Sequence, residues 1–174
     1  MTRNTLMLLI FLMMLSCVEG LGQKKELELG YSEFSSLQYY SASQYYEKAL
    51  AKMTGDSPEK LYATFMLAEC YRMMNDLAEA EPCYKALSTT SFCDSVPLVY
   101  LRYANILRTK GDLSGARENY YKYLQKDPGN LEAKSGLQSC DWILSGKNKR
   151  AQINIEPLDK INSPEDDFAP AYLS

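Results

Sequence analysis

One stretch of this sequence occurs twice, and the repeat restricts the fold more than any other feature. The segment AECYRMMNDLAEAEPCY ends at Tyr84, and ANILRTKGDLSGARENY ends 36 positions later at Tyr120. Alanine, aspartate, leucine and tyrosine keep the same register in both copies. Small and aromatic residues that recur with a period of about 34 are typical of stacked helical hairpins, because one hairpin cannot bury its apolar face alone. The sequence therefore predicts an all-α stack.

The composition excludes several classes of function. A chain of 174 residues with 46% hydrophobic and 24% charged residues fits one globular domain with short extensions. A net charge of -3 without a long basic run argues against nucleic acid as a partner. The chain has no histidine, no phosphate-binding glycine-rich loop and no nucleophile motif. We therefore expect no enzymatic activity, no cofactor and no metal site.

The N-terminal segment 1–22 has the features of a secretory signal peptide. Arg3 precedes ten consecutive apolar residues, Leu6 to Leu15, which are too few to span a bilayer as a helix of about 20 residues. Cleavage at the end of this segment leaves Gln23 as the first residue. Alternatively, the sequence MLSC resembles a lipoprotein box, in which Cys17 is acylated. Either route predicts an exported protein in the periplasm or on the periplasmic face of the outer membrane, with membrane contact only through Cys17.

Four cysteines follow the signal segment. Their spacings match no zinc-binding pattern. We expect Cys70 and Cys140 to be small buried residues of helices. Cys83 and Cys93 are the pair to test for a disulfide, which an oxidising compartment permits.

Residues 24–145 resemble the tetratricopeptide repeat. The segment GDLSGARENYYKYLQKDPGN carries the glycine, alanine, aromatic and proline positions of that family in its order. Asn75-Asp76 and Gly111-Asp112 are expected to form the turns between helices. The resemblance implies a right-handed superhelical stack of about three hairpins plus a C-terminal capping helix. The domain covers 23–146, with units at about 24–57, 61–94 and 97–130 and a cap at 131–145.

The cap is expected to be an amphipathic helix that closes the exposed end of the stack. Its apolar residues are Leu131, Leu137, Cys140, Trp142 and Ile143.

Stacked hairpins leave the first helix of each unit on a concave groove. Aromatic residues there offer rigid apolar area, and arginine and asparagine offer hydrogen bonds to a peptide. Arg72, Arg102 and Arg108 are candidates for a carboxylate clamp. Alternatively, the arginines form a solvated face paired with glutamates and the tyrosines belong to the core. The groove candidates are Tyr31, Phe34, Tyr62, Phe65, Glu69, Arg72, Met73, Leu101, Arg102, Asn105 and Arg108.

The segment 147–174 is a polar linker followed by an irregular, extended tail. Its sequence IEPLDKINSPEDDFAPAYLS is similar to the junction between repeats and propeller in a family of exported proteins, PorE-like proteins of gliding and type IX-secreting bacteria. Members combine tetratricopeptide repeats, a WD40-like propeller and an OmpA-like domain. The present sequence ends where the propeller is expected to begin, so we expect no peptidoglycan binding to carry over.

These features predict a scaffold or adaptor that binds a protein or peptide partner through its groove, in a type IX secretion or gliding-type envelope complex. The alternative is a lipid-anchored spacer or tether at the outer membrane without a specific groove ligand.

Overall fold

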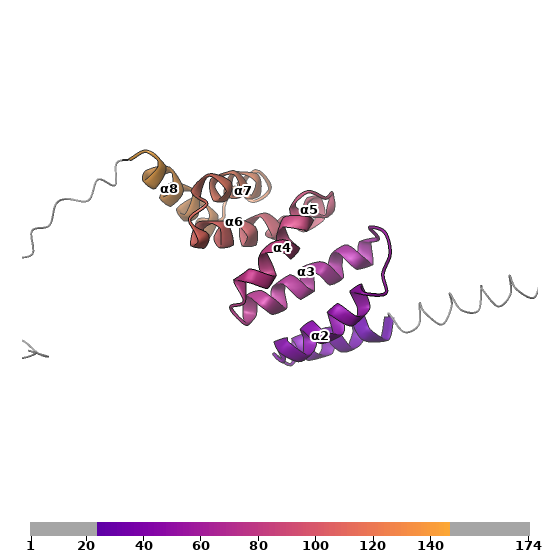
Figure 1. The fold of residues 1–174 in the computed structure, drawn as a ribbon. Coiled ribbons are helices and arrows are strands. Elements are labelled where there is room, and N and C mark those ends of the chain that lie inside the picture. The colour runs from indigo at the N-terminus through magenta and orange to yellow at the C-terminus, as the bar shows by residue number, and fades with distance from the viewer. Residues whose placement is uncertain (1–23, 147–174) are drawn as a thin grey trace, which may run out of the picture.

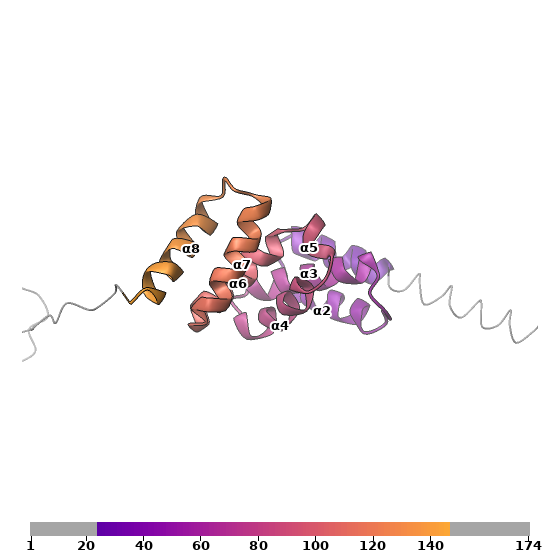
Figure 2. The ribbon, with the colours of Figure 1, turned by 90° about the horizontal axis from the view of Figure 1, so that it is seen from above.

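The computed structural model describes residues 24–146, which form a stack of helices (Figures 1 and 2). Consecutive long helices pack against each other, and α4 of the second hairpin packs against α6 of the third. The predicted all-α stack of helical hairpins is confirmed, and residues 24–146 contain no strand. The elements are a helical segment at 24–35, α2 (Tyr39–Leu50), α3 (Pro58–Met73), α4 (Leu77–Ser88), α5 (Phe92–Ser95), α6 (Leu98–Lys110), α7 (Leu113–Lys126) and α8 (Leu131–Leu144).

The second and third hairpins turn at the residues that the sequence predicts. Asn75 has a φ of 60° between α3 and α4, and Gly111 has a φ of 86° between α6 and α7. Asp76 and Asp112 then cap the second helices, because each accepts a hydrogen bond from the backbone N–H three residues later, at 3.2 and 2.9 Å. Both turns therefore follow from local preferences of asparagine, glycine and aspartate.

The first hairpin makes the same turn with less suitable residues. Leu37 has a φ of 62°, and the N–H of Gln38 donates to the carbonyl of Glu33 at 2.9 Å. The equivalent bond in the second hairpin joins Asp76 and Tyr71 at 2.8 Å. The side chain of Gln38 makes no cap hydrogen bond to α2. Because leucine disfavours the left-handed region, tertiary packing must hold this turn.

The core is built from large aromatic residues packed against small ones. Tyr46, Tyr84 and Tyr120 are the largest fully buried side chains, and each lies on the second helix of one hairpin. The small residues Ala68 and Ala104 are 0% exposed on the first helices of their hairpins. Cys140 is also 0% exposed and lies 36 positions after Ala104, as Ala104 lies 36 after Ala68. The helix α8 thus continues the register of the first helices.

Small residues also decide how α8 packs. Ala133, Gly136 and Cys140 are buried, whereas Leu131 and Trp142 are 79% and 55% exposed. The expectation that Leu131 and Trp142 help to close the stack is therefore wrong. The reason is close approach of the helices, because a Cβ added at Gly136 would lie 2.4 Å from Cζ of the buried Tyr120.

The cysteines of residues 24–146 are all free. Cys70 and Cys140 are 0% exposed, as predicted for small buried residues. The disulfide considered between Cys83 and Cys93 is absent, and the Cys93 thiol instead donates to the carbonyl of Leu87 at 3.2 Å.

The predicted signal segment 1–22, the lipidation at Cys17 and the tail at 147–174 lie outside the described residues. Within residues 24–146, no helix combines the length and apolar character needed to cross a membrane. In the same range, no three acidic or cysteine side chains are grouped so as to hold a metal ion.

Candidate functional site

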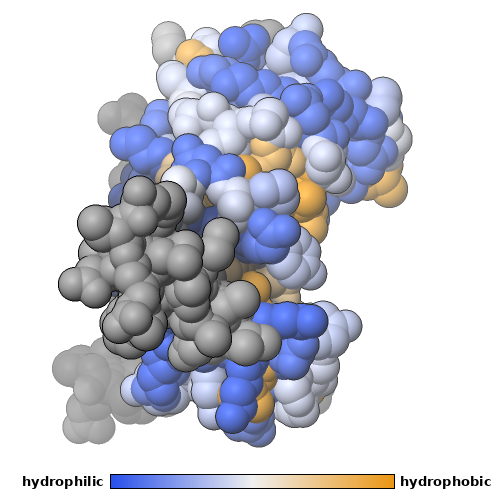
Figure 3. Space-filling view, turned by 90° about the vertical axis from the view of Figure 1, so that its right-hand side faces the viewer, coloured by the Kyte–Doolittle hydropathy of each residue, from blue (hydrophilic) through white to orange (hydrophobic). Residues whose placement is uncertain are grey.

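The first helices of the hairpins carry most of the predicted groove residues at accessible positions. Tyr31, Tyr62 and Met73 are exposed by 60%, 48% and 42%. Phe34 is half-buried and packs edge-on against Tyr39, with ring centroids 5.3 Å apart. Figure 3 shows one face of the molecule, on which hydrophobic residues form a patch within a mainly hydrophilic surface.

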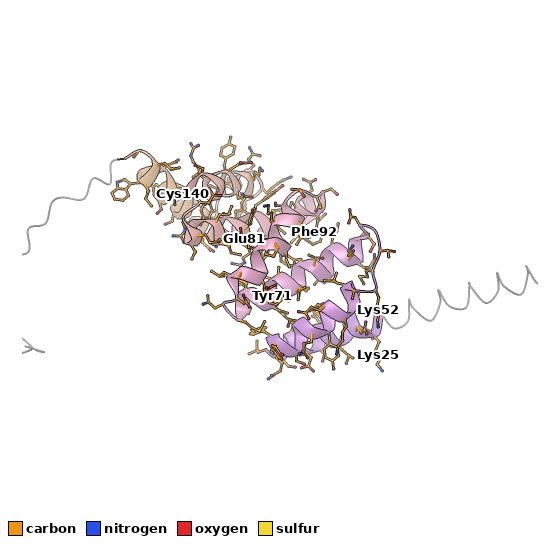
Figure 4. All side chains as sticks on the ribbon, in the orientation of Figure 1. Lys25, Lys52, Tyr71, Glu81, Phe92 and Cys140 are labelled. Atoms are coloured by element: carbon orange, nitrogen blue, oxygen red, sulfur yellow. The ribbon has the colours of Figure 1, made fainter. Side chains whose placement is uncertain are left out.

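Two predicted groove residues belong to the core instead. Leu101 is 2% exposed. Phe65 is 8% exposed and packs against Tyr84 and against Phe92 of α5, with ring centroids 6.5 and 6.0 Å apart. The prediction fails for both because the first helix of a later hairpin packs against the preceding hairpin on one side. The position of Phe92 in the short helix α5 is labelled in Figure 4.

A buried carboxylate organises the middle of this surface, in what we call the Glu69 cluster: Glu69, Arg72, Tyr84 and Arg102. Glu69 is only 7% exposed and accepts a hydrogen bond from the hydroxyl of Tyr84. The Arg72 guanidinium donates to Glu69 from Nη2 at 2.6 Å and from Nε at 3.1 Å. Nε of Arg102, from the next hairpin, lies 3.5 Å from the same carboxylate. The two arginines are therefore engaged inside the molecule.

The third hairpin repeats this arrangement with a neutral acceptor, in the Asn105 cluster: Asn105, Arg108, Tyr120 and Glu132. The hydroxyl of Tyr120 donates to Oδ1 of Asn105 at 2.6 Å and accepts from Nε of Arg108 at 3.0 Å. Nδ2 of Asn105 donates to Glu132 of α8 at 2.8 Å. These four residues line a polar hollow of about 210 Å³. Arg108 pairs with a hydroxyl rather than a carboxylate and is exposed.

The N-terminal end of the surface is apolar. A hollow of about 330 Å³ lies between the helical segment 24–35 and α3, and we call it the tyrosine pocket. Tyr31 and Tyr62 are its exposed aromatic residues, and Glu59 is its only charged one. The lining residues are Leu27, Tyr31, Tyr46, Pro58, Glu59 and Tyr62.

The site offers no activated nucleophile among the described cysteines. Burial raises the pKa of the Cys70 thiol to about 12, with a smaller contribution from the charge of Glu69. Burial likewise raises the pKa of Cys83 to about 11. Burial and the adjacent Glu69 raise the pKa of the Tyr84 hydroxyl. These groups stay protonated near neutral pH, so the surface is suited to binding by shape and hydrogen bonds.

Sequence reasoning missed the role of the buried tyrosine hydroxyls. Tyr84 follows its acceptor Glu69 by 15 positions, and Tyr120 follows Asn105 by the same interval. The repeat register contained this signal, since polar residues stand at the same place in both copies. It also missed Glu132, because the contact of α8 with α6 depends on how the helices stack.

The fold is that of a tetratricopeptide-repeat protein. The first repeat domain of Spaghetti (RPAP3), solved with the HSP90 peptide SRMEEVD, is 22% identical with a TM-score of 0.58 and covers 71% of this chain and 93% of that one. The C-terminal repeat domain of a Plasmodium falciparum FK506-binding protein is 20% identical with a TM-score of 0.61, covering 76% and 94%.

A third similar structure is a secretion chaperone. SycD from Yersinia enterocolitica, solved with a peptide of the translocator YopD, is 16% identical with a TM-score of 0.57, covering 70% of this chain and 93% of that one. No protein-family model matches the sequence. No curated protein matches it either.

Proposed function

We propose that this chain is a non-enzymatic adaptor that binds an extended segment of a protein partner along the first-helix surface. The observation that carries the proposal is the pair of equivalent clusters, in which buried acceptors hold Arg72, Arg102 and Arg108 in fixed positions. Fixed polar groups beside an apolar pocket favour a peptide, because less side-chain entropy is lost on binding.

The similar structures support the class of partner. The RPAP3 domains were solved with HSP90 and HSP70 peptides, and the chaperones SycD and PcrH with segments of translocator proteins. The Glu69 cluster argues against an acidic peptide tail as the ligand here. Glu69 already supplies a carboxylate to Arg72 and Arg102, so a second carboxylate would meet like-charge repulsion.

We propose further that the partner belongs to an envelope complex of the type IX secretion or gliding kind. The support is the N-terminal segment 1–22, which has the pattern of an export signal, and the tail, whose sequence is similar to that family's junction. The protein then acts in the periplasm or on the periplasmic face of the outer membrane.

Site-specific photo-crosslinking tests the binding surface. A photoreactive phenylalanine analogue replaces Met73, which is exposed beside Arg72, and a control replaces Tyr121, which is exposed on α7. We expect the Met73 position to crosslink one envelope protein in cells and the Tyr121 position not to. Purified partner should then bind the chain, and Arg108→Glu should weaken it. Equal crosslinking from both positions would contradict the proposal and favour a spacer without a groove ligand.

Mass spectrometry of the N-terminus tests export. A mature chain that starts with pyroglutamate from Gln23 indicates a soluble exported form, and diacylglycerol on Cys17 indicates an anchored one. A chain that retains Met1 and fractionates with the cytoplasm would contradict the envelope assignment.

A further inference from the structure

The three buried tyrosines are equivalent, but only two of them have a hydrogen-bond acceptor. Tyr84 donates to Glu69 and Tyr120 donates to Asn105. The hydroxyl of Tyr46 is buried and has no partner among the described residues. An unsatisfied buried hydroxyl destabilises a folded protein, so native structures rarely keep one without a reason.

The missing acceptor has a cause in the sequence. In the other two hairpins the acceptor stands 15 positions before the tyrosine, on the first helix. Fifteen positions before Tyr46 stands Tyr31, whose side chain is 60% exposed. The residue before it is Gly30, and a Cβ added there would lie 3.1 Å from Cζ of Tyr46. The hydroxyl end of Tyr46 therefore lies against the same helical turn that supplies an acceptor elsewhere.

The unpartnered hydroxyl belongs to the tyrosine pocket. Tyr46 is one of the pocket's lining residues, with Tyr31 and Tyr62 beside it. Burial raises the pKa of Tyr46, and Cys70, Tyr62 and Tyr31 are the nearby groups that raise it further. The first hairpin thus combines an apolar hollow with one hydrogen-bond donor whose acceptor is absent from its own fold.

We propose that the tyrosine pocket binds an aliphatic, leucine-sized side chain of a partner peptide, and that a neutral carbonyl oxygen next to that side chain accepts the hydrogen bond from Tyr46. This inference rests on the proposed peptide-binding function and names the anchor of the ligand. Leu27, Pro58 and the tyrosine rings favour an aliphatic group. A carboxylate is disfavoured because no cation lines the pocket and Glu59 does.

The occupant fits the rest of the surface. Tyr62 lies on α3, about two helical turns before Glu69 and Arg72. An extended segment anchored at the pocket therefore continues toward the Glu69 cluster, where fixed guanidinium groups can meet its backbone carbonyls.

The experiment uses the full chain and a minimal probe, N-acetyl-leucine N-methylamide, titrated by NMR. We expect a dissociation constant on the order of 1 mM for a probe of this size, with shifts confined to residues around the pocket. N-acetyl-leucine, which carries a carboxylate, should bind more weakly. Shifts centred at the Asn105 cluster, absence of binding, or equal binding of both probes would overturn the inference.

Tyr46→Phe is the decisive variant because binding and stability should respond differently. Loss of one neutral hydrogen bond should weaken the probe about fivefold. The melting temperature of the free protein should not fall, because the hydroxyl has no partner to lose. Tyr84→Phe is the matched control, and it should lower the melting temperature and leave probe binding unchanged. If Tyr46→Phe destabilises the free protein as Tyr84→Phe does, the hydroxyl is already satisfied and the inference fails.

Tyr31→Asn provides a second check. It places at the equivalent position the residue that accepts from Tyr120 in the third hairpin. We expect higher stability and weaker probe binding, because Tyr46 then has an internal acceptor. If the crosslinked partner binds the chain with an affinity that Tyr46→Phe does not change, peptide binding stands and only the anchor is wrong. If the probe binds but no partner does, the pocket stands without the proposed function.

Discussion

At the scale of single residues, the hairpins differ most in how their turns and hydroxyl groups are satisfied. The turn residue is Leu37, Asn75 or Gly111, and all three have a positive φ. Asparagine and glycine adopt this conformation readily, whereas leucine loses about 1 kcal/mol or more. The structure keeps an exposed leucine there, with 69% of its surface accessible.

Leu37→Gly should therefore stabilise the protein by about 1 kcal/mol, because the backbone strain disappears and an exposed side chain is lost. Urea denaturation followed by circular dichroism measures the change. The reciprocal control, Asn75→Leu, introduces the same strain in the second hairpin and should destabilise by a similar amount. A destabilising Leu37→Gly would mean that the side chain makes a contact that outweighs the strain.

Glu69 is the most consequential polar residue of the described part. Its replacement by alanine leaves the Tyr84 hydroxyl without an acceptor and removes the carboxylate from Arg72 and Arg102. We expect a loss of roughly 2–4 kcal/mol, because buried groups lose their partners together. Tyr84→Phe combined with Glu69→Ala should cost less than the sum of the single changes. Additive values in the double-mutant cycle would contradict the cluster.

At the scale of elements, small residues determine where helices meet. Tyr71 on α3 lies against α2, where its hydroxyl donates to Glu47 at 2.5 Å, and both Tyr71 and Cys140 are labelled in Figure 4. Cys140, Ala104 and Ala68 keep a 36-residue register on α8, α6 and α3. Helix α8 therefore packs as the first helix of another hairpin does, through small residues instead of its large apolar ones.

Gly136→Ala tests this close approach. Alanine has the better helix propensity, but its Cβ would lie 2.4 Å from Cζ of the buried Tyr120. We expect destabilisation of roughly 1–3 kcal/mol, since the overpacked interface must open. Ser135→Ala, at an exposed position of the same helix, is the control and should be neutral or slightly stabilising. Thermal melts of both variants decide the outcome, and equal melting temperatures would show that α8 shifts freely.

At the scale of the whole molecule, buried thiols and hydroxyls link stability to pH. The folded protein holds the pKa of Cys70 at about 12 and of Cys83 at about 11, above the ordinary thiol value of 9.0. Burial also raises the pKa values of Tyr46 and Tyr84 above 10.0. A raised pKa means that the unfolded chain releases its protons first as pH rises.

Stability should therefore be constant below pH 9 and fall between pH 9 and 12. Urea midpoints measured across this range give the slope. Cys70→Ala should reduce the slope above pH 9, although the substitution itself changes the stability at neutral pH. An unchanged slope in this variant would show that Cys70 does not contribute to the alkaline loss.

The sequence was sufficient for the repeat fold because the signals are local and periodic. Asn75 and Gly111 predict the turns, and the alanine and tyrosine positions predict which faces are buried. The groove was harder to predict. Tyr31 and Tyr62 lie at accessible positions, but Phe65 and Leu101 are buried because packing between successive hairpins covers one side of each first helix.

The sequence by itself determined the class of fold and the register of the repeat, since both depend on residues within one or two helical turns. Only the tertiary structure decided that Glu69 is shared by Tyr84, Arg72 and Arg102, and that Tyr46 has no acceptor. Hydrogen-bond partners depend on side-chain positions across three helices, and no local pattern specifies them. The physical reason is that burial fixes which polar groups can meet, and burial is a property of the assembled stack.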